Sequence, residues 1–216
     1  MDYSNEKYKK QGIHLLSVVF TVRSGKFKTL LVNRKLEPFK NLWAIPGGAL
    51  YNDESVESGL SRELFEKTGI CDIEHKHFGI YSDVDRAPNF RMVALAYVSV
   101  IDSEKVDILN QTSHTNDADW WDINSLPEMA FDHKIIIEDA INYLRRHLYD
   151  SDIMKNLFPK EFTLPEIHKA YESVLETKID RRNFRKKLIL DGVIEDTGKV
   201  FVKTGTKSSK LYKFVK

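Results

Sequence analysis

The pattern of the chain changes between residues 149 and 159, and this change constrains the fold more than any other feature of the sequence. Before it, apolar and β-branched runs alternate with turns, and after it come two short helical patterns and two alternating segments. A chain of 216 residues has the length of one or two domains. We therefore predict two domains, residues 1–149 and residues 150–216.

The N-terminal part consists mainly of predicted strands, and these are residues 13–22, 29–34, 73–80, 92–101 and 118–123. One helix interrupts them, because Val56, Leu60 and Leu64 recur at a spacing of four residues and Gly69 suits a helix end. A second helix is predicted after Asp132, with an apolar stripe that faces a core. Strands mixed with helices in this order indicate an α+β domain.

The C-terminal part has a different order of elements. A helix, a second helix and two alternating segments are predicted over residues 164–175, 181–192, 193–202 and 210–216. Thr163 and Asp180 are suitable caps for the two helices. Helix, turn, helix and a two-stranded ribbon is the order of a winged helix-turn-helix.

Charge is unevenly distributed between the two parts, although the whole chain has a net charge of only +1. Residues 151–216 carry 15 Lys and Arg against 9 Asp and Glu, whereas the rest is acidic. A basic domain attached to an acidic one is typical of a chain whose basic half meets a polyanion. The alternative is chance segregation of solvated surface charge.

Neither a secreted nor a membrane protein is expected from this sequence. Its single cysteine, Cys71, excludes an intramolecular disulfide and a multi-cysteine zinc site. The start of the chain is charged and polar, and its longest apolar run, residues 13–22, is far shorter than the ~20 residues of a membrane helix. We expect a cytoplasmic location without membrane contact.

The segment of residues 48–70, GALYNDESVESGLSRELFEKTGI, contains the most specific motif of the chain. It resembles the signature of the Nudix hydrolases: Gly, five residues, Glu, seven residues, then Arg-Glu-apolar-x-Glu-Glu-x-Gly-apolar. The matching residues are Gly48, Glu54, Arg62, Glu63, Leu64, Glu66, Gly69 and Ile70. The resemblance implies a Nudix α/β/α sandwich with a mixed sheet.

One position departs from the signature, because Lys67 stands where the family has its third glutamate. Converging carboxylates hold Mg²⁺, which neutralises the charge that develops when a diphosphate is cleaved. An ammonium group cannot ligate a metal, and Lys67 can instead pair with Glu63 four residues earlier. We therefore predict a catalytically degraded domain that serves as a ligand pocket and needs no cofactor. The alternative is a slow Mg²⁺-dependent hydrolase of nucleoside diphosphate-linked compounds that uses Glu63 and Glu66 as metal ligands, with Glu54 and Arg62.

The second helix of the C-terminal part presents its basic residues beside an apolar Phe184 and Leu188 anchor. Arginine can bind guanine through two hydrogen bonds and asparagine can bind adenine, while lysines contact mainly phosphate. The predicted DNA-binding residues are Arg181, Arg182, Asn183, Arg185 and Lys186 on the helix, and Lys203, Lys207 and Lys210 on the wing. A merely solvated basic face is the alternative.

A Nudix-like domain followed by a basic winged helix is similar to the NrtR-type Nudix-related transcriptional regulators. This resemblance spans nearly the whole chain and implies a homodimer that binds palindromic operators in double-stranded DNA. Members of the family respond to ADP-ribose and govern NAD metabolism, and relatives control sugar utilisation. The family commonly continues with Asp-Pro-Arg-Gly-Arg after the position of Asp85 and Arg86, whereas this chain has Ala-Pro-Asn-Phe-Arg at residues 87–91. This departure argues against ADP-ribose as the effector.

We therefore predict a ligand-responsive DNA-binding regulator in which effector binding to the Nudix half favours one dimer geometry. The small-molecule effector is expected to be a sugar or an ADP-ribose-like compound. The residues proposed to contact it are Arg34, Trp43, Asp85, Arg86, Arg91 and His133. For Asp85, Arg86 and Arg91 a surface ion-pair cluster is the alternative, and for His133 a place in the pocket wall is favoured over metal ligation.

Overall fold

The computed structural model describes residues 11–149, 151–202 and 208–215. Its residues form two compact units, the first made of residues up to 19, 29–99 and 106–140. The second contains residues 20–28, 100–105 and everything described from 141 onward. The tip of the first hairpin and the end of the long helix thus group with the C-terminal unit, whereas the sequence placed a single boundary after residue 149.

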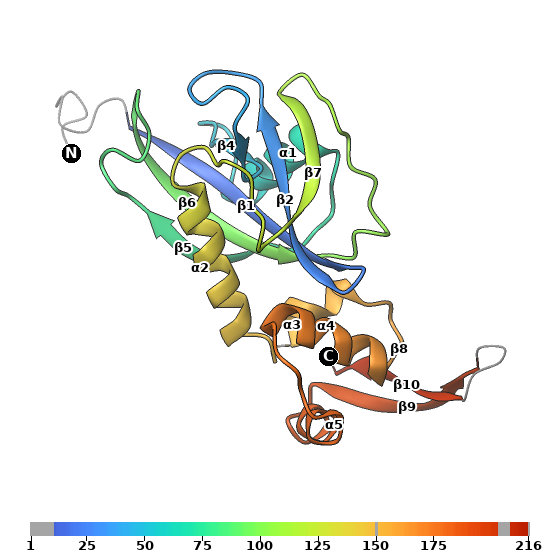
Figure 1. Ribbon diagram of the computed structural model, residues 1–216. Helices are drawn as coiled ribbons and strands as arrows, with labels where there is room; N and C mark the ends of the chain where they lie inside the picture. The colour runs from blue at the N-terminus through green and yellow to red at the C-terminus, as the bar shows by residue number, and fades with distance from the viewer. Residues whose placement is uncertain (1–10, 150, 203–207, 216) are drawn as a thin grey trace. The chain divides into compact units, whose positions relative to one another are not determined.

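The first unit is built on one seven-stranded sheet (Figure 1). Its main path has the order β3-β2-β1-β6-β5, while β4 pairs with β1 and β7 pairs with β2. The strands are β1 (Gln11–Arg23), β2 (Lys26–Arg34), β3 (Trp43–Ala44), β4 (Gly47–Ala49), β5 (Lys76–Tyr81), β6 (Arg91–Val100) and β7 (Thr115–Asp122). The turn between β1 and β2 has φ of 53° at Ser24 and 74° at Gly25, which suits a tight hairpin because glycine adopts the left-handed region without strain.

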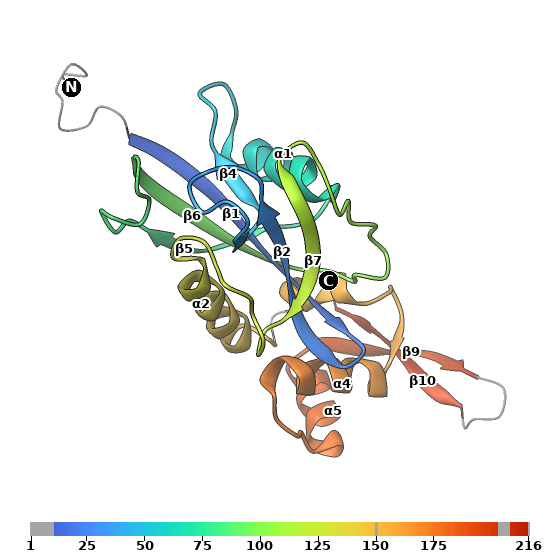
Figure 2. The same cartoon turned by 45° about the horizontal axis from the view of Figure 1, so that its top comes forward.

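Two helices cover the sheet on its opposite sides, α1 (Val56–Thr68) and α2 (His133–Arg146) (Figures 1 and 2). The central strand β1 is buried without a break from Leu15 to Thr21, as a strand covered on both faces must be. The residues of α2 that are buried in this unit include Ile136, Ile137 and Ala140. Burial of both faces explains why this strand reads as a continuous apolar run rather than an alternating one.

Helix α1 is fixed at both ends by its own sequence. The side chain of Ser55 accepts a hydrogen bond from the backbone N–H of Ser58 at 3.2 Å and so caps the first turn. Gly69 ends the helix in the left-handed conformation, with φ of 77°, and its N–H donates to the carbonyl of Phe65. Leu60 and Leu64 are buried, so one face of α1 packs on the sheet and the charged residues of the motif occupy the other sides.

The C-terminal unit contains short helices and a small sheet of order β8-β10-β9. Its elements are α3 (Ser151–Met154), a 3₁₀ turn η2 (Lys155–Leu157), β8 (Phe162–Thr163), α4 (Leu164–Leu175), α5 (Arg181–Leu190), β9 (Ile194–Phe201) and β10 (Ser209–Phe214). The sequence predicted a two-stranded ribbon, and the structure adds β8, in which Phe162 pairs with Tyr212. A strand of two residues is too short to have a recognisable period.

The predicted helix caps of this unit are present. The Glu166 carboxylate accepts hydrogen bonds from the Thr163 N–H at 2.6 Å and from its hydroxyl at 2.8 Å. The Asp180 side chain accepts from the N–H of Asn183 at 2.8 Å and thereby begins α5. Phe184 of α5 packs edge-on against Tyr171 of α4 with ring centres 5.1 Å apart, so one side of α5 is buried and the other is left to solvent.

Candidate functional site

Arg62 gathers the carboxylates of the Nudix-like motif. It donates two hydrogen bonds to Glu54, Nε to Oε2 at 2.8 Å and Nη2 to Oε1 at 2.6 Å, and its guanidinium lies over the Tyr51 ring at 3.8 Å. This hydrogen bonding from Arg62 lowers the pKa of Glu54 to about 2. Glu54 is therefore a fixed carboxylate partner of Arg62 rather than a group free to take up a proton.

Glu63 is held between two cations. Its Oε1 accepts from Arg62 at 2.8 Å and its Oε2 accepts from the Lys67 ammonium at 2.5 Å. Burial alone would raise the pKa of Glu63, but Lys67 and Arg62 together hold it below its usual value. A Cβ at Gly48 would collide with this carboxylate, which explains the glycine at the start of the motif. The predicted pairing of Lys67 with Glu63 is confirmed.

These carboxylates do not fit a divalent cation. Both oxygens of Glu63 are occupied by cationic donors, and Lys67 also donates to the carbonyl oxygen of Gly47. Glu66 lies 3.5 Å from Arg62 and 3.9 Å from the His114 ring. Within the described parts of the chain, no three His, Cys, Asp or Glu side chains are grouped so that they could hold a metal ion. Lys67 holds an oxygen of Glu63 that a metal ion would need as a ligand.

Two adjoining cavities open beside this network in the first unit, with volumes of about 640 and 160 Å³. They share five lining residues, which are His14, Arg34, Gly47, Lys67 and Phe131. The larger cavity is completed by the loop of residues 87–90 with Met92, and the smaller one by His114 and His133 among others. Cationic groups and aromatic rings therefore face the same space.

Phe131 is the aromatic centre of this site. It has φ of 54°, a left-handed conformation that is costly for a bulky residue. The Arg34 guanidinium lies 4.9 Å from the centre of its ring, and the ring of Phe39 meets it edge-on at 4.8 Å. Strained backbone conformations of this kind cluster at ligand sites and switch regions. Phe131 also lies two residues before the start of α2.

Two histidines of the site, His14 and His133, have lowered pKa values and are neutral. Burial, assisted by the cations Arg86 and Lys67, lowers the pKa of His14 to about 4. His133 is buried, its pKa is lowered well below the usual value by burial, and its Nδ1 accepts a hydrogen bond from the N–H of Ile45 at 3.0 Å. Its proton therefore lies on Nε2, and the residue serves in the wall of the cavity.

The structure brings Arg34 and His133 to the cavities, whereas the other proposed effector contacts lie elsewhere. Trp43 packs edge-on against Trp121 at 5.1 Å, and Arg86 forms a paired ion bridge with Asp132 at 2.7 and 2.9 Å. Asp85 is exposed outside the cavity lining. Arg91 donates hydrogen bonds to the carbonyl oxygens of Ser82, Asp83 and Met92 and so stabilises the loop.

Sequence reasoning missed His14, Phe131 and Phe90 as lining residues. Only His14 carries a local signal, since it is a polar residue inside an apolar strand run. Phe90 is 62% exposed and belongs to the loop that departs from the family pattern. The other two could not be found from spacing, because the lining comes from segments far apart in the chain.

The second candidate site is the outer side of α5. Arg181, Arg182, Asn183 and Lys186 are exposed there. With the residues that the structure describes, neither the two arginines nor Lys186 forms an ion pair. These side chains are available for a polyanion, and base contacts by them stay a prediction.

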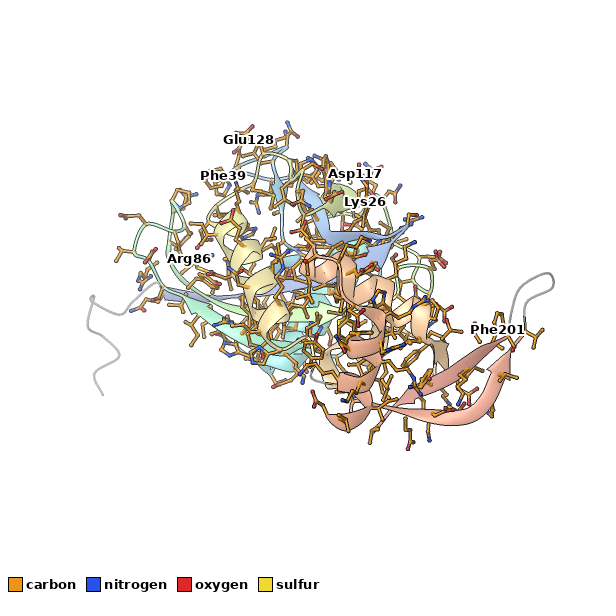
Figure 3. The ribbon with its side chains drawn as sticks, turned by 60° about the horizontal axis from the view of Figure 1, so that its bottom comes forward. Lys26, Phe39, Arg86, Asp117, Glu128 and Phe201 are labelled. Atoms are coloured by element: carbon orange, nitrogen blue, oxygen red, sulfur yellow. The ribbon has the colours of Figure 1, made fainter. Side chains whose placement is uncertain are left out.

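Two of the predicted DNA-binding residues, Arg185 and Lys210, already have partners within the C-terminal unit. The Nε of Arg185 donates to the hydroxyl of Tyr212 on β10 at 2.9 Å, so this arginine is tied to the wing. Lys210 pairs with Asp196 across the ribbon at 2.7 Å. On the same ribbon, Phe201 is 50% exposed at the end of β9 (Figure 3). Lys203 and Lys207 lie outside the described residues.

Comparisons with known families and proteins match both parts of the chain. The family model of the NUDIX domain matches residues 14–140, and that of the NrtR DNA-binding winged helix domain matches residues 154–214. The chain is 27% identical over 216 residues to the ADPR responsive transcriptional repressor NtrR of Acinetobacter baylyi, covering 98% of this chain and 85% of that protein.

Two solved structures are also similar to this chain. Shewanella oneidensis NrtR complexed with a 27mer DNA has a TM-score of 0.79 and 27% identity, over 94% of this chain and 93% of that chain. The NUDIX domain of the same protein complexed with ADP ribose has a TM-score of 0.60 and 28% identity, over 66% of this chain and 94% of that chain. These matches confirm the predicted fold class, a Nudix-like mixed sheet followed by a winged helix.

Proposed function

This chain belongs to the Nudix family and, with its NrtR winged helix domain, to the NrtR-type transcriptional regulators, and from this premise we propose that its effector is ADP-ribose or a close diphosphate-linked relative. The observation that carries the proposal is the presence of Lys67 and Arg34 in one cavity with Phe131. Two cations suit a diphosphate, and an aromatic ring suits a base or sugar face. The similar protein domain complexed with ADP ribose supports this choice of ligand.

In the loop of residues 87–91, the residues of this chain differ from those of the family pattern. The proposed effector would therefore meet other side chains there. Ala87, Pro88, Asn89 and Phe90 line the larger cavity, where the family pattern would supply an arginine. Phe90 can offer an apolar face in its place, while Lys67 and Arg34 supply the positive charge. A neutral sugar remains the competing effector, because it would use polar contacts and would gain little from the two cations.

The DNA-binding half is proposed to act as part of a homodimer on a palindromic operator in the cytoplasm. The exposed basic side of α5 would enter the major groove, and the ribbon would contact the backbone. The protein would act as a repressor that the effector releases from DNA. Effector binding would favour a dimer geometry that no longer matches the spacing of the two operator half-sites. No helix among the described residues has the length and hydrophobicity needed to cross a membrane.

The proposal is tested by selecting DNA sites with the full-length protein and then titrating ADP-ribose against the selected operator. We expect ADP-ribose to lower operator affinity about tenfold, within the range of ordinary allosteric coupling. L-arabinose is the matched neutral ligand and should leave the affinity unchanged. If arabinose alone releases the DNA, the sugar alternative replaces the diphosphate effector.

Hydrolysis is not the function that the geometry favours. Glu63 is bound by Lys67 and Arg62, and Glu54 is bound by Arg62, so no carboxylate pair is left to converge on Mg²⁺. We expect no turnover of ADP-ribose near the ~10 s⁻¹ typical of enzymes, in Mg²⁺ or in Mn²⁺. Chromatography of the two monophosphates that cleavage of a diphosphate linkage releases measures this directly, and turnover that Glu63→Gln abolishes would restore the hydrolase alternative.

A further inference from the structure

Lys67 lies in the last turn of α1 and belongs to the lining of both cavities. Its side chain is 17% exposed, so it is neither fully enclosed nor a solvated surface lysine. The ammonium group has three N–H donors, and two of them are used by Glu63 and the Gly47 carbonyl. The third donor is left for a ligand in the cavity.

Glu63 fixes the position of Lys67. Arg62 is paired mainly with Glu54, whereas the Lys67 ammonium is held by Glu63 beside the cavities that it lines. A divalent cation that entered this position would have to displace the Lys67 ammonium from Glu63, against Coulomb repulsion from two positive groups. Lys67 therefore already supplies a positive charge in the lining of the cavities.

A second cation completes the binding surface. Arg34 lines both cavities, and its Nε and one Nη donate to the carbonyl oxygens of Pro38 and Leu36. These bonds fix the guanidinium, and its other Nη has no hydrogen-bond partner among the described residues. The pKa of His14 is lowered mainly by burial, and the positive charges of Lys67 and Arg34 lower it further. This shows that both cations act on the same part of the cavity lining.

Resting on the proposed function, we propose that this cavity binds the phosphate groups of its ligand without a divalent cation, with the Lys67 ammonium in the place of the metal. Charge-assisted hydrogen bonds from Lys67 and Arg34 would hold the anion directly. The replacement of the third glutamate by lysine then removes a metal ligand, and it also removes the need for a metal ion in anion binding. An enzyme motif becomes a metal-independent anion receptor.

Calorimetric titration of the full-length protein tests this with two probes, ADP-ribose and inorganic pyrophosphate, each in EDTA and in Mg²⁺. We expect both probes to bind in EDTA, with dissociation constants within about twofold of those in Mg²⁺ after correction for chelation of the probe by the metal. Lys67→Met should weaken both probes about tenfold or more in EDTA, as loss of a charge-assisted hydrogen bond predicts.

A charge reversal gives the sharper comparison. Lys67→Glu restores the third carboxylate of the motif. This variant should not bind ADP-ribose or pyrophosphate in EDTA, and it should bind them again in Mg²⁺. The double variant Glu63→Gln with Lys67→Met avoids an unpaired buried carboxylate, and it should bind as weakly as Lys67→Met while it melts near the wild-type temperature. Lys105→Met is the matched control, because Lys105 pairs with Asp102 and lines neither cavity. This variant should bind both probes as the wild type does.

The outcomes separate the two proposals. Binding by the wild type that requires Mg²⁺, or equal affinity in Lys67→Met, overturns the metal-independent site and leaves the effector unaffected. If pyrophosphate binds in EDTA in a way that depends on Lys67 while ADP-ribose does not bind, the proposed effector is wrong. The same result supports the metal-independent anion site. Absence of binding by either probe in either medium overturns both.

Discussion

Arg86 pairs with Asp132 where solvent reaches only 1% of the arginine side chain. The pair joins the loop that supplies cavity-lining residues 87–90 to the residue before α2. One nitrogen of this guanidinium, Nη1, is buried without a hydrogen-bond partner within the described structure. A residue that the sequence indicated as an effector contact therefore serves to hold the loop in place.

We expect Arg86→Ala to lower the free energy of unfolding by about 3 kcal/mol, because it leaves Asp132 without its partner at a largely buried position. Urea denaturation measures this loss. Arg91→Ala is the matched control on the same loop, since Arg91 donates only to backbone carbonyls and should cost clearly less. Equal losses in the two variants would show that the ion pair contributes nothing beyond an ordinary hydrogen bond.

At the scale of the element, α5 separates its arginines into two roles. Arg182 is exposed near the N-terminal end of the helix, the end that reaches base edges in recognition helices. Arg185 is fixed by the Tyr212 hydroxyl at 2.9 Å, and its guanidinium lies 5.9 Å from the centre of the same ring. The helix thus carries two arginines without an ion pair among the described residues, Arg181 and Arg182, and a third, Arg185, that is tied to the wing.

We expect Arg182→Ala to weaken operator binding by ~1–3 kcal/mol and to relax sequence preference at one position. Lys187→Ala is the control on the same helix, because Lys187 pairs with Asp191 and lies 4.7 Å from the Tyr149 ring. Fluorescence anisotropy with the selected operator and a scrambled duplex measures both effects. A loss that is the same on both duplexes would assign Arg182 to the phosphate backbone.

At the scale of the whole molecule, buried neutral histidines make stability depend on pH. Burial lowers the pKa of His75 to about 4, and its Nδ1 lies 2.9 Å from the Ser99 hydroxyl and 3.2 Å from that of Ser17. An unfolded histidine has a pKa near 6.5, so the unfolded chain binds the proton first as pH falls. The stability contributed by the neutral form is complete above pH ~6.5 and is lost toward pH ~4.

We therefore expect the free energy of unfolding to fall between pH ~6.5 and pH ~4, with His75 alone contributing on the order of 3 kcal/mol by the lower limit. Chemical denaturation at several pH values measures the slope. His75→Gln should flatten the profile in this window, while His77→Gln on the same edge strand changes an exposed residue and should leave it as in the wild type. A variant profile as steep as that of the wild type would rule out His75 as a source.

Much of the fold could be predicted from local pattern. The long apolar run of β1, the four-residue spacing in α1 and the caps Thr163 and Asp180 all act through neighbouring residues, so periodicity and capping identify them. The strands β3, β4 and β8 contain two or three residues each and exist only because a neighbouring strand pairs with them. Such elements have no period of their own.

The sequence by itself determined the family motif, the substitution at Lys67 and the basic helix, because these depend on residue types at fixed spacing. The tertiary structure decided which side chains share the cavity, since His14, Arg34, Lys67 and Phe131 come from four distant segments. It also decided that Arg86 and Arg185 are held by Asp132 and Tyr212. An arginine looks the same in the sequence whether it awaits a ligand or already has a partner, because the partner is supplied by folding.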